Sequence, residues 1–110
     1  MAQQVVRVDI LRTLAFGSIS GTYAPVGSSF THNMRLIRFQ NTTDVGITVS
    51  FDSVTDNLYL PSGTFLLFDV TTNRLENLTT FCFANGTQVY VKGSPTSGAF
   101  YVECLYGQGD

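Results

Sequence analysis

The residues that could carry chemistry are few in this chain and lie far apart. His32 is the only histidine, and it sits in the polar segment Thr31-His32-Asn33. Nucleophilic, zinc and phosphate chemistry is usually marked by patterns such as Gly-x-Ser-x-Gly, Cys-x-x-Cys, His-x-x-x-His or a glycine-rich phosphate loop, and the sequence contains none of them. We therefore interpret His32 as a solvated loop side chain. We predict that the chain is not an enzyme and has no catalytic residue.

Acidic residues gather in the middle of the chain. Asp44, Asp52 and Asp56, followed by Asn57, lie in adjoining polar segments. Asp and Asn side chains bond to nearby backbone groups in turns, so a turn-forming role accounts for them. A weak Ca²⁺ site built from Asp52, Asp56 and backbone carbonyls is the alternative, although the spacing does not match an EF-hand loop. We expect no bound cofactor and no resident metal.

The tyrosines offer a different kind of chemistry, because aromatic rings can stack on sugars. They are Tyr23, Tyr59, Tyr90, Tyr101 and Tyr106. Tryptophan, the usual sugar-stacking residue, is absent from the sequence. We interpret the tyrosines as strand-edge residues with one polar end in water. A lectin-like site is the alternative.

The two cysteines lie in strand-like runs. Cys82 is flanked by phenylalanines, and Cys104 stands between Glu103 and Leu105. We predict two buried free thiols, because buried cysteine behaves as a small apolar residue. A disulfide is the alternative, and it would require neighbouring strands with Cα atoms within about 7 Å.

Composition and charge set the broad class. Charged residues make up 13% of the chain, about half the usual share, and the net charge is −2. Such a chain has no basic surface for phosphate backbones, so we expect no nucleic acid partner. A weakly charged surface rich in hydroxyl and amide groups suits a protein that is held among copies or partners. Many secreted β domains are also rich in threonine, which leaves that class open.

The first residues do not have the pattern of a targeting segment. Arg7, Asp9 and Arg12 interrupt the apolar residues there, so we predict no signal peptide. No run approaches the ~20 apolar residues that cross a membrane, so we expect no membrane partner. We expect the protein to be made in a cytoplasm and to leave it only by assembly or lysis.

Short strands must position all of these residues. Alternation is cleanest over 46–52, where Ile47 and Val49 face one way and Thr48 and Ser50 the other. Turn residues separate such segments at the spacing of a sandwich or barrel. The predicted strands span residues 5–16, 34–41, 46–52, 58–60, 64–70, 81–83, 88–91 and 99–106, with a short strand near 22–24.

Several connections have a specific prediction. The Pro61-Ser62-Gly63 segment is a turn, and Asn85-Gly86 predicts a type I′ hairpin between residues 81–83 and 88–91. The strand over 64–70 is apolar on both faces, as a central strand would be, and a neighbouring subunit could cover its second face. Only Thr71–Leu78 has helical character, and it is too short for more than a turn or two.

The sequence therefore predicts an all-β fold, a single-domain antiparallel β-sandwich over residues 1–110, either jelly-roll or Ig-like. We expect about seven to nine strands. An N-terminal strand or arm covers about residues 1–16, and a flexible tail covers about 107–110. The arm could add to the sheet of an adjacent subunit.

A resemblance to a known family rests on turn and strand motifs spread over about residues 35–107. The motifs are NTTD (41–44), ITVSFD (47–52), LPSG (60–63) and GTQVYVKG (86–93), with the ending SGAFYV (97–102) through LYG (105–107). Together they resemble the small β-sandwich structural proteins encoded among the head and neck genes of tailed bacteriophages. The segment Thr71–Thr80 is longer and more polar than that pattern, either as a partner-contacting insertion or as a loop.

The resemblance implies a virion protein that acts by packing in symmetric copies. Members serve as neck or head-to-tail connectors, tail components or capsid decoration proteins. It implies a homo-oligomer that contacts portal, capsid or tail proteins and is assembled in the host cytoplasm. A carbohydrate- or host-surface-binding β-sandwich module is the alternative function.

Overall fold

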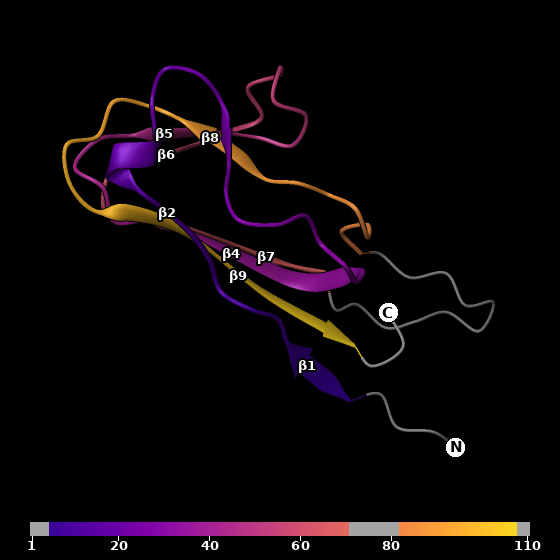
Figure 1. Cartoon of the computed structure of the whole chain (residues 1–110). Helices are drawn as coiled ribbons and strands as arrows, with labels where there is room; N and C mark the ends of the chain where they lie inside the picture. The colour runs from indigo at the N-terminus through magenta and orange to yellow at the C-terminus, as the bar shows by residue number, and fades with distance from the viewer. Residues whose placement is uncertain (1–4, 71–81, 108–110) are drawn as a thin grey trace.

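The computed structural model describes residues 5–70 and 82–107, which form two packed antiparallel β-sheets (Figure 1). The elements are β1 (Val6–Val8), β2 (Arg12–Ala15), η1 (Phe16–Ser18), β3 (Ala24–Pro25), β4 (Met34–Asn41), β5 (Ile47–Ser50), β6 (Leu58–Leu60), β7 (Phe65–Asp69), β8 (Tyr90–Lys92) and β9 (Ala99–Gly107). The first sheet has the order β1–β9–β4–β7, with β2 also pairing with β9, and the second has the order β3–β8–β5–β6. No helix in this part of the chain is long and apolar enough to cross a membrane.

The strands pair in a nested order. β2 pairs with β9, β3 with β8, β4 with β7 and β5 with β6, and every pair is antiparallel. This is the pairing of one long hairpin rolled into two layers, with β1 as an additional edge strand. The predicted β-sandwich is therefore confirmed, and of its two forms the strand order matches the jelly roll and not the immunoglobulin sheets.

The core lies between the two sheets and follows the alternation of their strands. Ile37 and Phe39 of β4 and Phe100, Val102 and Cys104 of β9 are buried, while the residues between them face outward. Burying one large apolar side chain stabilises a fold by about 1.5–3 kcal/mol. The second sheet contributes Ile47, Val49, Leu60 and Val91 to the core, and the loop between β3 and β4 contributes Val26 and Phe30.

Most predicted strands are confirmed. Those at 34–41 and 58–60 have the predicted bounds, and those at 46–52, 64–70 and 99–106 differ by one or two residues at their ends. The short strand expected near 22–24 is β3. The Pro61-Ser62-Gly63 turn also forms, with Gly63 at a φ of +74° that favours glycine.

The single strand predicted at the N-terminus is wrong, because the segment forms two strands, β1 and β2. Val8 lies opposite Leu105 and Arg12 lies opposite Val102. The N-terminal segment therefore advances by four residues where β9 advances by three. The additional residue is a β-bulge, which reverses the faces of the side chains that follow it. Val8 consequently points outward and is 78% exposed, whereas Arg12 points inward and is 2% exposed.

Arg12 attaches this segment to the loop before β4. Its Nη1 donates to Asp9 Oδ2 at 2.8 Å and its Nε donates to the Ser28 carbonyl at 2.7 Å. Its Nη2 donates to the Ser29 carbonyl at 3.3 Å, and its guanidinium lies 5.0 Å from the centroid of the Phe30 ring. These contacts compensate a buried cation. The arm that we hypothesised for an adjacent subunit is, in this structure, an edge of its own sheet.

The hairpin predicted around Asn85-Gly86 does not form, and the turn there is not of type I′, because Asn85 lacks the positive φ that this type requires at both central residues. Gly86 adopts a φ of +93°. The flanking segments do not pair with each other, because Phe83 bridges to Met34 and β8 pairs with β3 and β5. The chain therefore crosses here from the first sheet to the second and does not form a hairpin.

The prediction of a central strand over 64–70 is also wrong. Among the described residues, β7 pairs only with β4, so it is an edge strand. Leu66 and Phe68 pack against the core, while Phe65 is 60% exposed and Leu67 is 47% exposed. The second apolar face of this strand is thus open in the single chain. The helical turn predicted at Thr71–Leu78 and the tail after Gly107 lie outside the described residues.

Candidate functional site

His32 does not have the environment that we predicted for it. Its ring is half-buried and stacks on Tyr106, with ring centroids 3.8 Å apart and an angle of 4° between the planes. The expected solvated side chain is therefore a packing residue at the end of β9. In residues 5–70 and 82–107, no three His, Cys, Asp or Glu side chains are grouped to hold a metal ion.

Asp52 has the turn-forming role that we predicted. Its Oδ1 accepts the backbone N–H groups of Val54 at 2.9 Å and Thr55 at 2.7 Å, and Ser50 Oγ donates to the same atom at 2.8 Å. These hydrogen bonds, the one from Thr55 N–H foremost, hold the pKa of Asp52 well below its usual range. Ser53 completes the turn at a φ of +65°.

The other two aspartates connect separate loops. Asp44 accepts hydrogen bonds from the backbone and hydroxyl groups of Thr96, and these bonds lower its pKa. Asp56 accepts the hydroxyl of Tyr23 and lies 3.1 Å from Lys92 Nζ, and the tyrosine hydrogen bond is the main reason that its pKa is lowered. Asp52 and Asp56 thus bind different protein groups, and they do not form the shared ligand set that the Ca²⁺ alternative requires.

The cysteines are free thiols, as predicted, but only one is buried. Cys104 lies in the core at 2% exposure, whereas Cys82 is exposed, which corrects the prediction that both are buried. Burial raises the pKa of the Cys104 thiol to about 11. It is therefore protonated at neutral pH and is a poor nucleophile.

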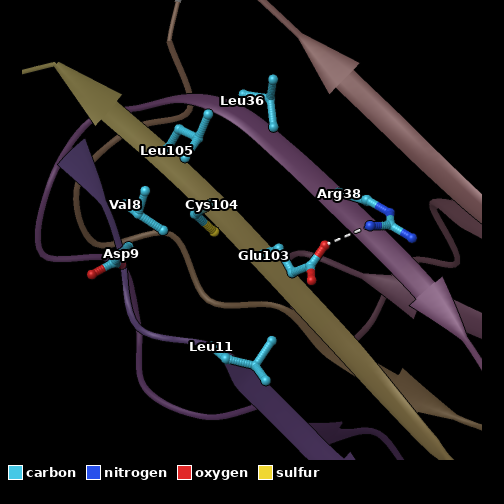
Figure 2. A pocket seen from close by; sticks show the side chains of 8 residues that line it. All are labelled: Val8, Asp9, Leu11, Leu36, Arg38, Glu103, Cys104 and Leu105. Carbon is cyan, nitrogen blue, oxygen red and sulfur yellow. Dashed lines mark hydrogen bonds and ion pairs between the residues drawn. The ribbon is translucent and has the colours of Figure 1, made fainter. Parts of the chain in front are cut away.

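A groove lies on the outer side of the first sheet (Figure 2). Its volume is about 350 Å³. Val8 and Leu11 form one wall, Leu36 and Leu105 approach from β4 and β9, and Cys104 lies beneath them. The bulge after β1 produces this wall, because it turns Leu11 outward while it turns Arg12 inward.

One ion pair lies at the end of this groove. Arg38 Nη1 is 3.0 Å from Glu103 Oε1, and both side chains are partly exposed (Figure 2). The Arg38 guanidinium also donates to Gln40 Oε1 at 3.1 Å and lies 5.1 Å from the centroid of the Phe65 ring. Arg38 therefore links the groove to the exposed side chains of β7, without adding net charge.

The groove belongs to a larger surface, which we call the apolar face. It consists of outward side chains of the first sheet and of the bulge beside it. Five of them are exposed by 47–78%, and the two leucines of β4 and β9 are half-buried. Its members are Val6, Val8, Leu11, Leu36, Phe65, Leu67 and Leu105.

The outer side of the second sheet has a different composition, and we call it the polar face. Tyr59 of β6 lies opposite Thr48 of β5, which in turn lies opposite Lys92 of β8. Lys92 Nζ is 4.7 Å from the centroid of the Tyr23 ring. The predicted strand-edge role fits Tyr59, which is 64% exposed on an edge strand. It is wrong for Tyr90, Tyr101 and Tyr106, because their strands β8 and β9 are paired on both sides. The polar face comprises Tyr23, Thr48, Asp56, Asn57, Tyr59 and Lys92.

Comparison with known proteins adds no relative: no family model, curated protein or solved structure matches the chain. The fold and its surfaces define the class as a jelly-roll β-sandwich with one apolar and one polar outer face. The sequence pattern predicts the apolar residues of 64–70. It does not predict the groove, because the groove depends on a bulge that local alternation does not reveal.

Proposed function

We propose that this protein is a structural component of a tailed-phage virion and acts by packing its apolar face against a second copy of the chain. Within the virion it would serve at the neck or head-to-tail junction, in the tail, or as a capsid decoration. The apolar face is the observation that carries the proposal. Monomeric proteins rarely expose contiguous apolar patches of several hundred Å² unless the patch binds something.

The size of the apolar face fits a protein interface. The first sheet is four strand positions wide and its longest strand has nine residues, so the face covers roughly 600 Å² in projection. A standard stable interface covers about 800 Å² on each partner. The face and its rim together therefore provide enough surface for one partner.

The charges on the apolar face favour a second copy as that partner. The Arg38–Glu103 pair is neutral as a unit, so this pair does not oppose the packing of two such faces. A rotation that exchanges the copies could also bring each Arg38 near the other copy's Glu103. Only 13% of the residues are charged, and this low share supports packing in many copies.

The fold supports the proposal without deciding it. Jelly rolls occur in viral capsid proteins and in lectins, so the architecture is compatible with both candidate functions. The resemblance of the turn motifs to phage structural proteins points to the virion. The polar face favours the second candidate, a carbohydrate-binding module, through its exposed Tyr59.

The mass of the protein in solution tests the proposal. We expect the wild-type chain to form a discrete oligomer in light scattering coupled to gel filtration. Val8→Glu places a charge on the apolar face and should weaken self-association by at least about tenfold. Val8 is 78% exposed, so the fold should tolerate the change.

Val54→Glu is the matched control. Val54 is 81% exposed but lies in the loop between β5 and β6, away from the apolar face. It should leave the oligomer unchanged. A wild-type chain that stays monomeric, or equal effects of the two variants, would refute packing through this face.

A further inference from the structure

The polar face is arranged around one exposed aromatic ring. Tyr59 stands at the edge of the second sheet, in a row with Thr48 and Lys92 on the adjacent strands. Its ring is 64% exposed, yet it has a defined position. A Cβ at Gly46 would lie 1.8 Å from the Tyr59 hydroxyl and 2.3 Å from Cζ, so the phenol end occupies space that only a glycine leaves open.

Two planar polar groups lie beside this ring, and each has one atom engaged within the protein. Asn57 Oδ1 accepts the N–H of Phe51 at 3.0 Å, which fixes the amide and leaves its Nδ2 as a donor. Both contacts of Asp56, with Tyr23 and Lys92, use Oδ1. Among the described residues, Asp56 Oδ2 and Asn57 Nδ2 have no protein partner, so they can serve a ligand.

These groups surround a shallow depression of about 280 Å³. Thr48, Asp56, Asn57, Leu58 and Tyr59 line it. Lys92 neutralises the neighbouring carboxylate at 3.1 Å, so the depression has no net charge. The site therefore offers a flat aromatic surface, a hydroxyl, a fixed amide donor and a carboxylate acceptor, all facing the same small volume.

We propose that this depression binds a neutral saccharide, with one pyranose ring lying on Tyr59. The axial C–H bonds of a pyranose form an apolar face that packs on an aromatic ring. Its vicinal hydroxyls can each donate and accept, as Asp56 Oδ2 and Asn57 Nδ2 require. A protein partner fits this site less well, because Leu58 is the only aliphatic side chain among the residues that line the depression.

The row of side chains across the sheet also suggests the length of the ligand. The backbone of Tyr59 on β6 and that of Tyr23, which directly precedes β3, are separated by about three strand spacings, or roughly 14 Å. A short oligosaccharide spans this distance. The apolar face lies on the opposite sheet, so binding here is independent of the proposed packing and would remain accessible in an oligomer.

Nuclear magnetic resonance titration of the full chain tests the proposal, with maltohexaose, cellohexaose and chitohexaose as probes. An open site of this size binds in the millimolar range, so each probe is added to about 10 mM. We expect saturable shifts of the amide signals of Gly46, Thr48, Asn57 and Tyr59 with at least one probe. Tyr59→Ala should weaken binding by about tenfold or more.

Two further variants keep the result interpretable. Asn57→Asp retains the acceptor for Phe51 N–H but removes the amide donor, and it should weaken binding without changing the fold. Tyr101→Ala removes a tyrosine from the outer side of the first sheet and should have no effect. The proposal fails if no probe gives saturable shifts, if the shifts map to the first sheet, or if Tyr59→Ala binds like the wild type. Loss of the oligomer in Val8→Glu with intact saccharide binding would separate the two proposals.

Discussion

The two sheets of this sandwich have the same kind of inner face and opposite kinds of outer face. Inside, both follow the alternation that buries Phe39 and Phe100 from one sheet and Ile47 and Val49 from the other. Outside, the first sheet presents mainly aliphatic and phenylalanine side chains beside Tyr101 and the Arg38–Glu103 pair, whereas the second presents hydroxyl groups, tyrosines and a Lys–Asp pair. The inner faces determine the fold, and we propose a different partner for each of the two outer faces.

The contrast has a structural origin at the N-terminus. One additional residue between β1 and β2 turns Val8 and Leu11 outward and Arg12 inward. Without this bulge, Val8 and Arg12, four residues apart, would point to the same side of the sheet, so Arg12 could not be buried while Val8 is exposed. The inserted residue thus adds the valines to the apolar face while it places the arginine in the core.

The largest expected effect comes from removing the residue that holds this arrangement. Arg12→Met deletes the hydrogen bonds to Asp9, Ser28 and Ser29 and leaves a mostly buried carboxylate without its partner. Breaking a buried pair in this way costs about 3–5 kcal/mol. We expect this loss in the free energy of unfolding measured with urea, and amide signals should change in β1, β2 and β9 more than in β5 and β6.

Arg7→Met is the control for this prediction. Arg7 lies on β1 and is exposed, so the free energy of unfolding of this variant should stay within about 0.5 kcal/mol of the wild-type value. Equal stabilities of the two variants would show that Arg12 does not hold the N-terminal segment. The apolar face would then need another explanation for its shape.

The next largest effect tests the joint between the two sheets. Asn41 ends β4 and is fully buried, and its Nδ2 donates to the Val45 carbonyl at 2.9 Å and to the Leu60 carbonyl at 3.0 Å. Its Oδ1 accepts the N–H of Thr43 at 2.9 Å. Asn41→Ala leaves these buried groups unpaired, which should lower the free energy of unfolding by about 1–3 kcal/mol.

Since Asn41 joins the sheets, its loss should disturb both outer faces, unlike the loss of Arg12. We expect amide shift changes near Val8 and near Tyr59 in the same spectrum, together with lower stability in urea. Gln40→Ala, on the outward side of the same strand, should be nearly neutral. Changes confined to one sheet would argue that the faces are positioned independently.

The sequence predicted what local patterns determine. Strands at 34–41 and 58–60 follow from alternation and flanking turns, and so does the turn at Gly63. What depends on pairing between distant segments was missed: the bulge beside Arg12 is visible only against β9, and the edge position of β7 only from the sheet order. The polar face was missed for the same reason, because Tyr59, Thr48 and Lys92 meet through the register of three strands.

The smallest expected effect is a pH dependence at the aspartates beside the second sheet. Hydrogen bonds lower the pKa of Asp52 and of Asp56, so their ionised forms stabilise the folded state. A lowered folded-state pKa means that this stability is present above the ordinary value of about 3.9 and is lost as pH falls through the lower folded value. Saccharide binding next to Asp56 should weaken over the same acidic range.

A carboxylate titration by nuclear magnetic resonance between neutral and acidic pH measures this difference. Asp52 and Asp56 should titrate below the ordinary value, accompanied by amide shifts in the loop between β5 and β6. Asp52→Asn keeps the oxygen that accepts the Val54 and Thr55 N–H groups but removes the charge. The turn should therefore persist, and the amide shifts that Asp52 causes in this loop at acidic pH should disappear. If Asp52 instead titrates at or above about 3.9, the hydrogen bonds do not favour its ionised form, and the turn between β5 and β6 is less ordered than its contacts indicate.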